Sequence, residues 1–142
     1  MTYRTILLHV NDERRVAGLV DAAAHLATRH QAHLIGLFVM PPLPAYGAIS
    51  IGAGIVKGGL TAFRHEADRV RKAFEDACRG RPFVSEWRLA EHPVSTVAEV
   101  VMQHGRACDL VMASQRDRDW PFATLMDEPE RIAIECGRPV LI

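Results

Sequence analysis

Strand-like and helix-like segments alternate along the whole chain. Five short runs have the β-branched and leucine-rich composition of strands, at residues 5–10, 33–39, 83–90, 109–113 and 139–142. Four stretches between them repeat apolar residues at the spacing of a helix. Strict alternation with right-handed crossovers gives an open, mostly parallel sheet with helices on both faces. The order of the segments therefore predicts an α/β, doubly wound fold.

Three of the strand runs are almost continuously apolar: TILLHV, HLIGLFV and DLVMA. Such runs are typical of parallel strands that are buried on both faces. The run FVSEWRLA alternates instead, and its one side carries Phe83, Ser85, Trp87 and Leu89. This alternation predicts an edge strand with one wetter face.

The helical stretches each show one apolar stripe. The stripes are Val16, Leu19, Val20, Ala23 and Ala27; Phe63, Ala67, Val70, Phe74 and Ala77; Val97, Val100, Val101 and His104; and Leu125, Pro129, Ile132 and Cys136. A stripe of this kind gives a helix one face that packs on a sheet while the opposite face stays in water.

Length and charge limit what the chain can be. Its 142 residues are the size of one domain, so we expect a single domain over residues 1–142. Lys plus Arg and Asp plus Glu both total 17, so no net field attracts nucleic acid, and we expect no nucleic-acid partner. No run reaches the ~20 apolar residues of a membrane span, so we expect no membrane partner. The three cysteines are isolated, which predicts a reducing, cytoplasmic location.

Four segments, taken in order, resemble the universal stress protein family: ILLHVNDE with the helix that follows it, AHLIGLFVMPP, ACDLVMASQ and ERIAIECGRPVLI. Each motif alone is weak, but the ordered set is fairly specific and covers nearly the whole chain. The resemblance is greatest to the first halves of tandem stress proteins, in which a second, similar domain follows. It implies an open five-stranded parallel sheet of order 3-2-1-4-5, a Rossmann-like fold of the adenine nucleotide alpha hydrolase-like type.

The resemblance also implies where a nucleotide would bind. In the family, ATP or a related adenine nucleotide lies across the ends of the first and fourth strands, where the strand order reverses. Laid on this chain, the cleft falls at Val10, Asn11, Val39, Met112, Ser114, Arg116 and Asp127. Family members that bind ATP carry an Asp where this chain has Asn11. An Asn at this position can still accept a hydrogen bond from an adenine or a ribose.

The loop after the fourth strand departs from the family further. ATP-binding members carry Gly-x2-Gly-x9-Gly-Ser/Thr there, but the glycine positions fall near Arg116, Asp119 and Met126 in a loop about three residues shorter. Glycine brings backbone N–H groups against a phosphate, and a Cβ obstructs that approach. We therefore expect no ATP and no other cofactor. A second interpretation stays open, in which Arg116 and Arg118 bind a smaller anion.

The segment DEPE, which follows this loop, predicts a helix whose first backbone N–H groups are capped by its own side chains. Asp127 is placed to act as N-cap, Glu130 to close a capping box and Pro129 to lie in the first turn. Acidic side chains there also occupy the positive end of the helix dipole that a triphosphate needs. This junction therefore favours its own helix over a ligand.

Residues 40–59, MPPLPAYGAISIGAGIVKGG, predict a long apolar connection rich in proline and glycine. Loops of this length in compact domains are commonly functional or disordered. Tyr46, Ile49 and Ile51 need burial against the domain, a ligand or a partner. A mobile surface loop, a lid and an interface all remain open.

The residues able to carry catalysis or bind metal form no matching set. The seven histidines show no spacing typical of zinc ligands, so we expect no metal site. Ser114 lacks the Gly-x-Ser-x-Gly elbow of an activated serine, and Cys108 precedes its strand, at the end opposite the cleft. We therefore do not expect an enzyme.

The final run, GRPVLI, predicts an apolar edge strand, because the family places its fifth strand at the edge of the sheet. The unpaired N–H and C=O groups of an edge strand form a template for another strand. We expect Val140, Leu141 and Ile142 to form the interface of a two-fold homodimer, or to pair with a tandem second domain.

Together these features favour a non-enzymatic universal stress protein-type domain with a degenerate nucleotide site, acting in the stress response through protein-protein contacts. Two alternatives remain: an adenine nucleotide-binding stress protein with an atypical loop, and a small-molecule binding module capped by residues 40–59. A bound adenine nucleotide after purification favours the first alternative, and an apolar pocket under Tyr46 and Ile49 favours the second.

Overall fold

The computed structural model describes residues 2–42, 53–92, 94–115, 117–119 and 129–142. Its elements are β1 (Thr5–His9), the 3-10 turn η1 (Glu13–Arg15), α1 (Val16–His30), β2 (His33–Met40), α3 (Ala53–Cys78), β3 (Ser85–Glu91), α4 (Val97–Gly105), β4 (Leu110–Ala113), α5 (Glu130–Glu135) and β5 (Val140–Leu141). Among the helices in these ranges, none combines the length and the apolar character needed to cross a membrane.

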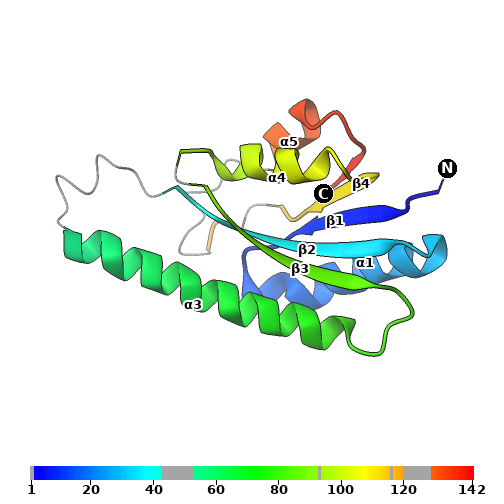
Figure 1. Cartoon of the computed structure of the whole chain (residues 1–142), viewed down its shortest axis with the longest axis horizontal. Coiled ribbons are helices and arrows are strands. Elements are labelled where there is room, and N and C mark those ends of the chain that lie inside the picture. Colours follow the sequence, from blue (N-terminus) through cyan, green and yellow to red (C-terminus); the bar gives the residue numbers. More distant parts are fainter. Residues whose placement is uncertain (1, 43–52, 93, 116, 120–128) are drawn as a thin grey trace.

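Five parallel strands form one sheet in the order β3-β2-β1-β4-β5. This order confirms the predicted α/β fold and the strand order 3-2-1-4-5. β1 lies at the centre, where Thr5 pairs with His33 of β2 and Ile6 pairs with Leu110 of β4. Helices α1 and α3 cover one face of the sheet, and α4 and α5 cover the other (Figure 1). The chain order therefore reverses between β1 and β4.

Burial follows the sequence pattern closely. β1, β2 and β4 are buried almost throughout, as their continuous apolar runs predicted. β3 is an edge strand, also as predicted, and its Trp87 packs on Phe74 of α3 with ring centroids 5.3 Å apart. Gly36 of β2 lies beneath this pair, where an added Cβ would come within 2.7 Å of the Phe74 ring and 2.8 Å of Trp87. The strand and the helix therefore pack too closely at this point for a side chain.

The connection between β2 and α3 is shorter than predicted. The sequence predicts an irregular segment over residues 40–59, but Met40 completes β2 and α3 begins at Ala53. The prediction was wrong for residues 53–59, because Gly58 and Gly59 are tolerated inside a helix of 26 residues whose later turns pack on the sheet. Residues 43–52 lie outside the described residues, so the expected role of this segment stays a prediction.

Candidate functional site

The carboxyl ends of β1 and β4 lie side by side at the point where the strand order reverses. His9, the last residue of β1, pairs with Ala113, the last residue of β4. Open parallel sheets bind ligands in the crevice beyond such a pair of strands. Residues 10–15 after β1 and the described residues 114, 115 and 117–119 after β4 therefore surround the candidate site.

Asn11 is bonded to the end of the neighbouring strand. Its side chain is buried, with 7% of the residue exposed. The amide Nδ2 donates to the carbonyl of Val39 at 3.0 Å, and Oδ1 accepts from the Val39 amide at 3.2 Å. An ionised aspartate in this position could accept from the Val39 amide but could not donate to its carbonyl. The asparagine therefore joins β1 to β2, in a role that only a carboxamide can fill completely.

Asp12 holds the turn that follows. Its Oδ1 accepts from the backbone amide of Arg14 at 3.0 Å and so caps η1. The Arg14 guanidinium also donates to both carboxylate oxygens of Asp12, at 3.1 and 2.9 Å, and to Asp117 at 3.0 Å. The pKa of Arg14 is raised, and the largest cause is its side-chain hydrogen bond to Asp12. Arg14 therefore ties the turn after β1 to the loop after β4 by two carboxylates.

Arg15 makes a second link across the same gap. Its Nη1 donates to the carbonyl of Gln115 and lies 3.3 Å from the hydroxyl of Ser114. The Ser114 hydroxyl in turn donates to the Gln115 carbonyl at 3.2 Å. Ser114 is thus bonded to its own backbone neighbour and to an arginine, and no described histidine activates it. Among the described residues, Ser114 lacks the hydrogen-bonded histidine that activates a serine hydrolase nucleophile.

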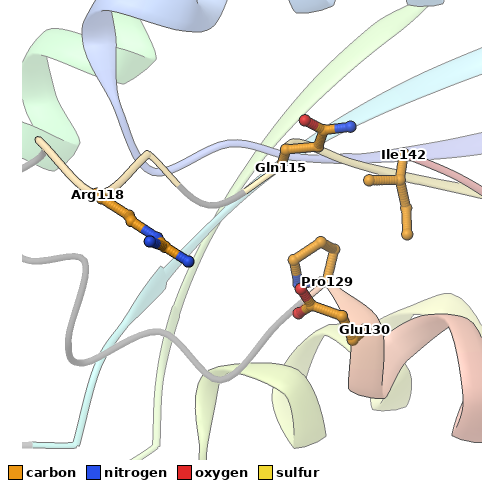
Figure 2. Close-up of a pocket in the computed structure, with 5 residues that line it drawn as sticks. All are labelled: Gln115, Arg118, Pro129, Glu130 and Ile142. Carbon is orange, nitrogen blue, oxygen red and sulfur yellow. The ribbon is translucent and has the colours of Figure 1, made fainter.

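Two open grooves flank the end of β4. The larger, of about 450 Å³, is lined by Arg14, Arg15, Gly18, Leu19, Ala113, Ser114, Gln115 and Ile142. The smaller, of about 340 Å³, is lined among the described residues by Gln115, Arg118, Pro129, Glu130 and Ile142. In Figure 2, Arg118 points into the smaller groove from the loop after β4, opposite Pro129 and Glu130 at the start of α5. Both grooves have an apolar wall at Ile142 and a charged rim.

The start of α5 differs from the predicted capping box. Pro129 is the N-cap residue, and no side chain forms a cap hydrogen bond. Glu130 is the first helical residue, so it does not occupy the third position that a capping box requires. The capping prediction was therefore wrong for Pro129 and Glu130, and Asp127 lies outside the described residues. Proline at this position provides no N–H and fixes the entry of the chain into a short helix.

The three cysteines of the chain lie in the core. Cys78, Cys108 and Cys136 are free and buried, and burial raises the pKa of Cys78 and Cys108. Cys108 lies at the end of the sheet away from the grooves, where its Sγ is 3.5 Å from the carbonyl of His104. No group of three potential metal ligands occurs in the part of the chain that the structure describes. Burial and a raised pKa make the thiols of Cys78 and Cys108 poor nucleophiles.

Solved structures of similar fold extend over nearly the whole chain. A protein from the universal stress protein family of Burkholderia pseudomallei has a TM-score of 0.69 at 23% identity, covering 98% of this chain and 94% of that chain. A universal stress protein family protein of Arabidopsis thaliana with AMP bound has a TM-score of 0.63 at 10% identity, covering 97% of this chain and 89% of that chain. The universal stress protein of Archaeoglobus fulgidus in complex with dAMP has a TM-score of 0.54 at 14% identity, covering 99% of this chain and 98% of that chain.

The chain has the universal stress protein fold. Neither a family model nor a curated protein matches the sequence. The resemblance read from four short segments is therefore confirmed at the level of fold. In two of the universal stress proteins named above, the solved structures hold adenine nucleotides, AMP and dAMP.

The seven residues that the sequence assigned to the nucleotide cleft fall into three groups. Three belong to the core, with exposed fractions of at most 3%: Val10, Val39 and Met112. Two follow the ends of β1 and β4 and make the bonds described above: Asn11 and Ser114. Two lie outside the described residues: Arg116 and Asp127. The universal stress protein fold thus brings the described five to the same end of the sheet, and of these five Ser114 lines one of the two grooves described above.

Sequence reasoning missed the arginines that bridge the site. Arg14 and Arg15 were not assigned to the cleft, yet they join the turn after β1 to Asp117 and Gln115. The signal was available in the run NDERR, which places two guanidinium groups directly after the first strand. Their partners lie about 100 residues away in the chain, so only the fold could reveal the contacts.

Proposed function

We propose that this chain is a universal stress protein family domain that acts in the stress response through contacts with other proteins, without catalysis and without ATP. The shared fold supports the family part of the proposal. One observation carries the part that concerns ATP, namely that the side chains of Asn11, Arg14 and Arg15 beside the cleft are bonded to carboxylates or to the backbone. We describe the nucleotide site as degenerate in this sense.

A nucleotide needs polar groups that are available to it. Asn11 is bonded to the backbone of β2, Arg14 to two carboxylates, and Arg15 to the end of β4. A triphosphate would have to displace such bonds, and a hydrogen bond to a charged group contributes about 1.5 to 3 kcal/mol. Two of the partners are themselves carboxylates, which repel an anion. The absence of glycine in the loop sequence adds a steric obstacle.

A second candidate function is adenine nucleotide binding through an atypical loop. The larger groove, at about 450 Å³, has the size of a small-molecule site. The solved universal stress proteins that hold AMP and dAMP favour this candidate. A third candidate, a small-molecule module capped by residues 40–59, depends largely on residues outside the described part of the chain.

The proposed protein contact is the edge strand β5. Leu141 and Ile142 are 46% and 48% exposed, and β5 pairs with β4 on one side only. We propose that Val140, Leu141 and Ile142 pair with a second copy of the chain or with a tandem second domain. A cytoplasmic location fits three buried cysteines that form no disulfide with one another.

Thermal unfolding with and without ligand tests the nucleotide proposal. Millimolar ATP with Mg²⁺ should leave the Tm of the chain unchanged, because a ligand without preference for the folded state does not stabilise it. The Arabidopsis thaliana protein, whose solved structure holds AMP, serves as the positive control in the same assay with AMP. A saturable rise in Tm with ATP contradicts the proposal, and a rise with AMP alone favours the second candidate.

A further inference from the structure

The end of the sheet where the strands begin carries an arginine before every strand. In the order of the sheet these are Arg81 before β3, Arg29 before β2, Arg4 before β1, Arg106 before β4 and Arg138 before β5. We call these five residues the arginine row. All five are exposed. The N-terminus and the connections α1–β2 and α3–β3 lie together at this end in Figure 1.

Hydrogen bonds between the connecting segments fix the neighbours in the row. Arg138 donates to the backbone carbonyl of Arg106 at 2.6 Å. The carboxylate of Asp109 accepts from the backbone amide of Arg4 at 2.7 Å, and the Arg4 carbonyl accepts from His33 at the start of β2 at 2.8 Å. Neighbouring strands lie about 4.8 Å apart, so five of them extend the row over about 20 Å.

The acidic groups at this end are already engaged. Asp21 forms an ion pair with Arg81. Asp109 accepts hydrogen bonds from the backbone amides of Arg4 and Thr5. These bonds, and to a lesser extent the nearby guanidinium charges, lower the pKa of Asp109. The remaining members of the row form no ion pair with any carboxylate in the described ranges: Arg4, Arg29, Arg106 and Arg138. All four are exposed, although Arg4 and Arg138 lie near enough to the Asp109 carboxylate to contribute to the lowering of its pKa.

Helix termini account for part of this arrangement. Arg29 lies in the last turn of α1 and Arg106 is the C-cap residue of α4. A cation at a helix C-terminus is favourable by about 0.3 to 1 kcal/mol. The terminus supplies only about half a negative charge, so it leaves most of each guanidinium charge uncompensated. Arg4 follows no described helix, so a helix dipole does not explain its place in the row.

We propose that the arginine row is a docking surface for an extended acidic segment of a partner protein. The inference rests on the proposed function, in which the domain works through protein contacts, and it names the chemistry of the partner. Guanidinium groups bind carboxylates through two parallel hydrogen bonds. An extended segment of about six residues covers 20 Å. Val84, 69% exposed at the β3 end of the row, offers an apolar contact as well.

Two observations favour an acidic protein over a nucleic acid. The net charge of the chain is zero, so the row acts at short range without the overall field that steers proteins to nucleic acids. The described aromatic residues at this end, Tyr3 and Phe83, are half-buried and pack against the core, and Tyr3 also lies edge-on to His30. They leave no aromatic platform on which a base could stack.

Fluorescence anisotropy with a labelled hexaglutamate peptide tests the proposal on the full chain. The wild type should bind the peptide at low salt, and physiological salt should weaken binding about tenfold, because exposed charges are screened. The double variant Arg4→Gln/Arg106→Gln should weaken it by at least about fivefold, since two of five cations are lost. Neither described side chain makes a hydrogen bond, so the variant should fold, with its Tm lowered by no more than a few degrees through the loss of the Arg106 charge at the C-terminus of α4.

The matched control is Arg64→Gln/Arg69→Gln, which removes the same charge at the other end of the sheet. Arg64 pairs with Glu91 at the end of β3, and Arg69 pairs with Glu13 after β1 and with the buried Glu66, so the Tm of this variant is measured alongside its binding. This variant should bind the peptide like the wild type. Equal losses in both variants, or no binding by the wild type at millimolar peptide, overturn the proposal.

A second comparison separates the possible partners. A single-stranded oligonucleotide of the same charge should bind more weakly than the peptide. If it binds more tightly and loses affinity in the row variant, the partner is a nucleic acid and the assignment to an acidic protein is wrong. Stabilisation by ATP would contradict the proposed function while leaving the peptide result in place, so the two failures can be told apart.

Discussion

At the scale of single residues, Asn11 ties the end of β1 to the neighbouring strand β2. The resemblance to the family predicted an available side chain at the end of β1. In the fold, both polar ends of the Asn11 amide are bonded to Val39. The acid that the family carries is found one residue later, as Asp12, and there it holds Arg14 and caps η1. Asn11 thus links β1 to β2, and Asp12 holds the turn that follows β1.

Asn11→Asp should destabilise the fold. The variant loses the donor to the Val39 carbonyl and places a second carboxylate beside Asp12. We expect the free energy of unfolding at neutral pH to fall by about 1 to 3 kcal/mol, as measured by urea denaturation. The substitution should give no stabilisation by ATP, because Arg14 and Arg15 stay engaged.

A pH series provides the control for this variant. Burial and the lost donor both favour the protonated form of the introduced carboxyl, so its pKa should be higher in the folded state than in the unfolded state. The folded variant then binds more protons than the unfolded variant. Its loss of unfolding free energy relative to the wild type should therefore shrink as the pH falls through the folded-state pKa. A variant as stable as the wild type at neutral pH rules out the assigned role of Asn11.

At the scale of elements, the packing of α3 on β2 and β3 depends on a single glycine. Gly36 leaves room for the rings of Phe74 and Trp87, which meet above the strand. The apolar stripe of α3 and the alternation of β3 were visible in the sequence. Their contact over Gly36 was not, because it joins three segments that are far apart in the chain.

Two glycine-to-alanine substitutions should distinguish the effect of steric crowding on stability from the effect of backbone entropy. Gly36→Ala should lower the free energy of unfolding by about 1 to 3 kcal/mol, because the Phe74 and Trp87 rings must move. Gly18→Ala, in α1, has nothing within 4 Å of the new Cβ and should be neutral or stabilise by up to about 1 kcal/mol. Urea denaturation of both variants checks this, and equal effects would show that the close approach at Gly36 is unimportant.

The sequence predicted the elements of this fold well, and their contacts poorly. Periodicity located the five strands and the helical stripes, because burial on a sheet imposes it on each segment separately. The boundary of α3 was missed, since local glycine content indicated a loop where packing further along sustains a helix. The bridging of α4 to α5 by Arg131, which bonds Thr96 at 3.0 Å and Glu99 at 3.1 Å, was equally invisible. Such bonds depend on which segments the topology brings together.

At the scale of the whole molecule, the two ends of the sheet differ in chemistry. The carboxyl ends of the strands carry a network in which acidic groups engage Arg14 and Arg15 is bonded to the end of β4. The amino ends carry the arginine row, most of which has no described acidic partner. A chain with no net charge is thereby divided into unlike surfaces. The edge strand β5 provides a third, apolar surface.

Leu141→Lys should prevent association through β5. Leu141 is 46% exposed on the edge strand, and two lysines would meet in a two-fold contact of this strand with its copy. Sedimentation velocity at micromolar concentration should show a dimer for the wild type and a monomer for the variant. Leu60→Lys, at a residue of α3 that is 38% exposed, is the matched control and should remain dimeric. A monomeric wild type, or a dimeric Leu141→Lys variant, contradicts the proposal.

The central position of β1 also bears on the time course of folding. Asn11 and Val39, which join β1 to β2, are separated by 28 residues, whereas Arg4 and Asp109, which join it to β4, are separated by 105. Closing the longer loop costs about 1 kcal/mol more entropy, so we expect β1 and β2 to pair first and β4 to dock afterwards. Pulsed hydrogen exchange should protect the amides of β2 before those of β4, and simultaneous protection would exclude this order. The gap bridged by Arg14 and Arg15 would then close only when β4 docks, so a partly folded chain exposes this gap after β1 and β2 have already paired.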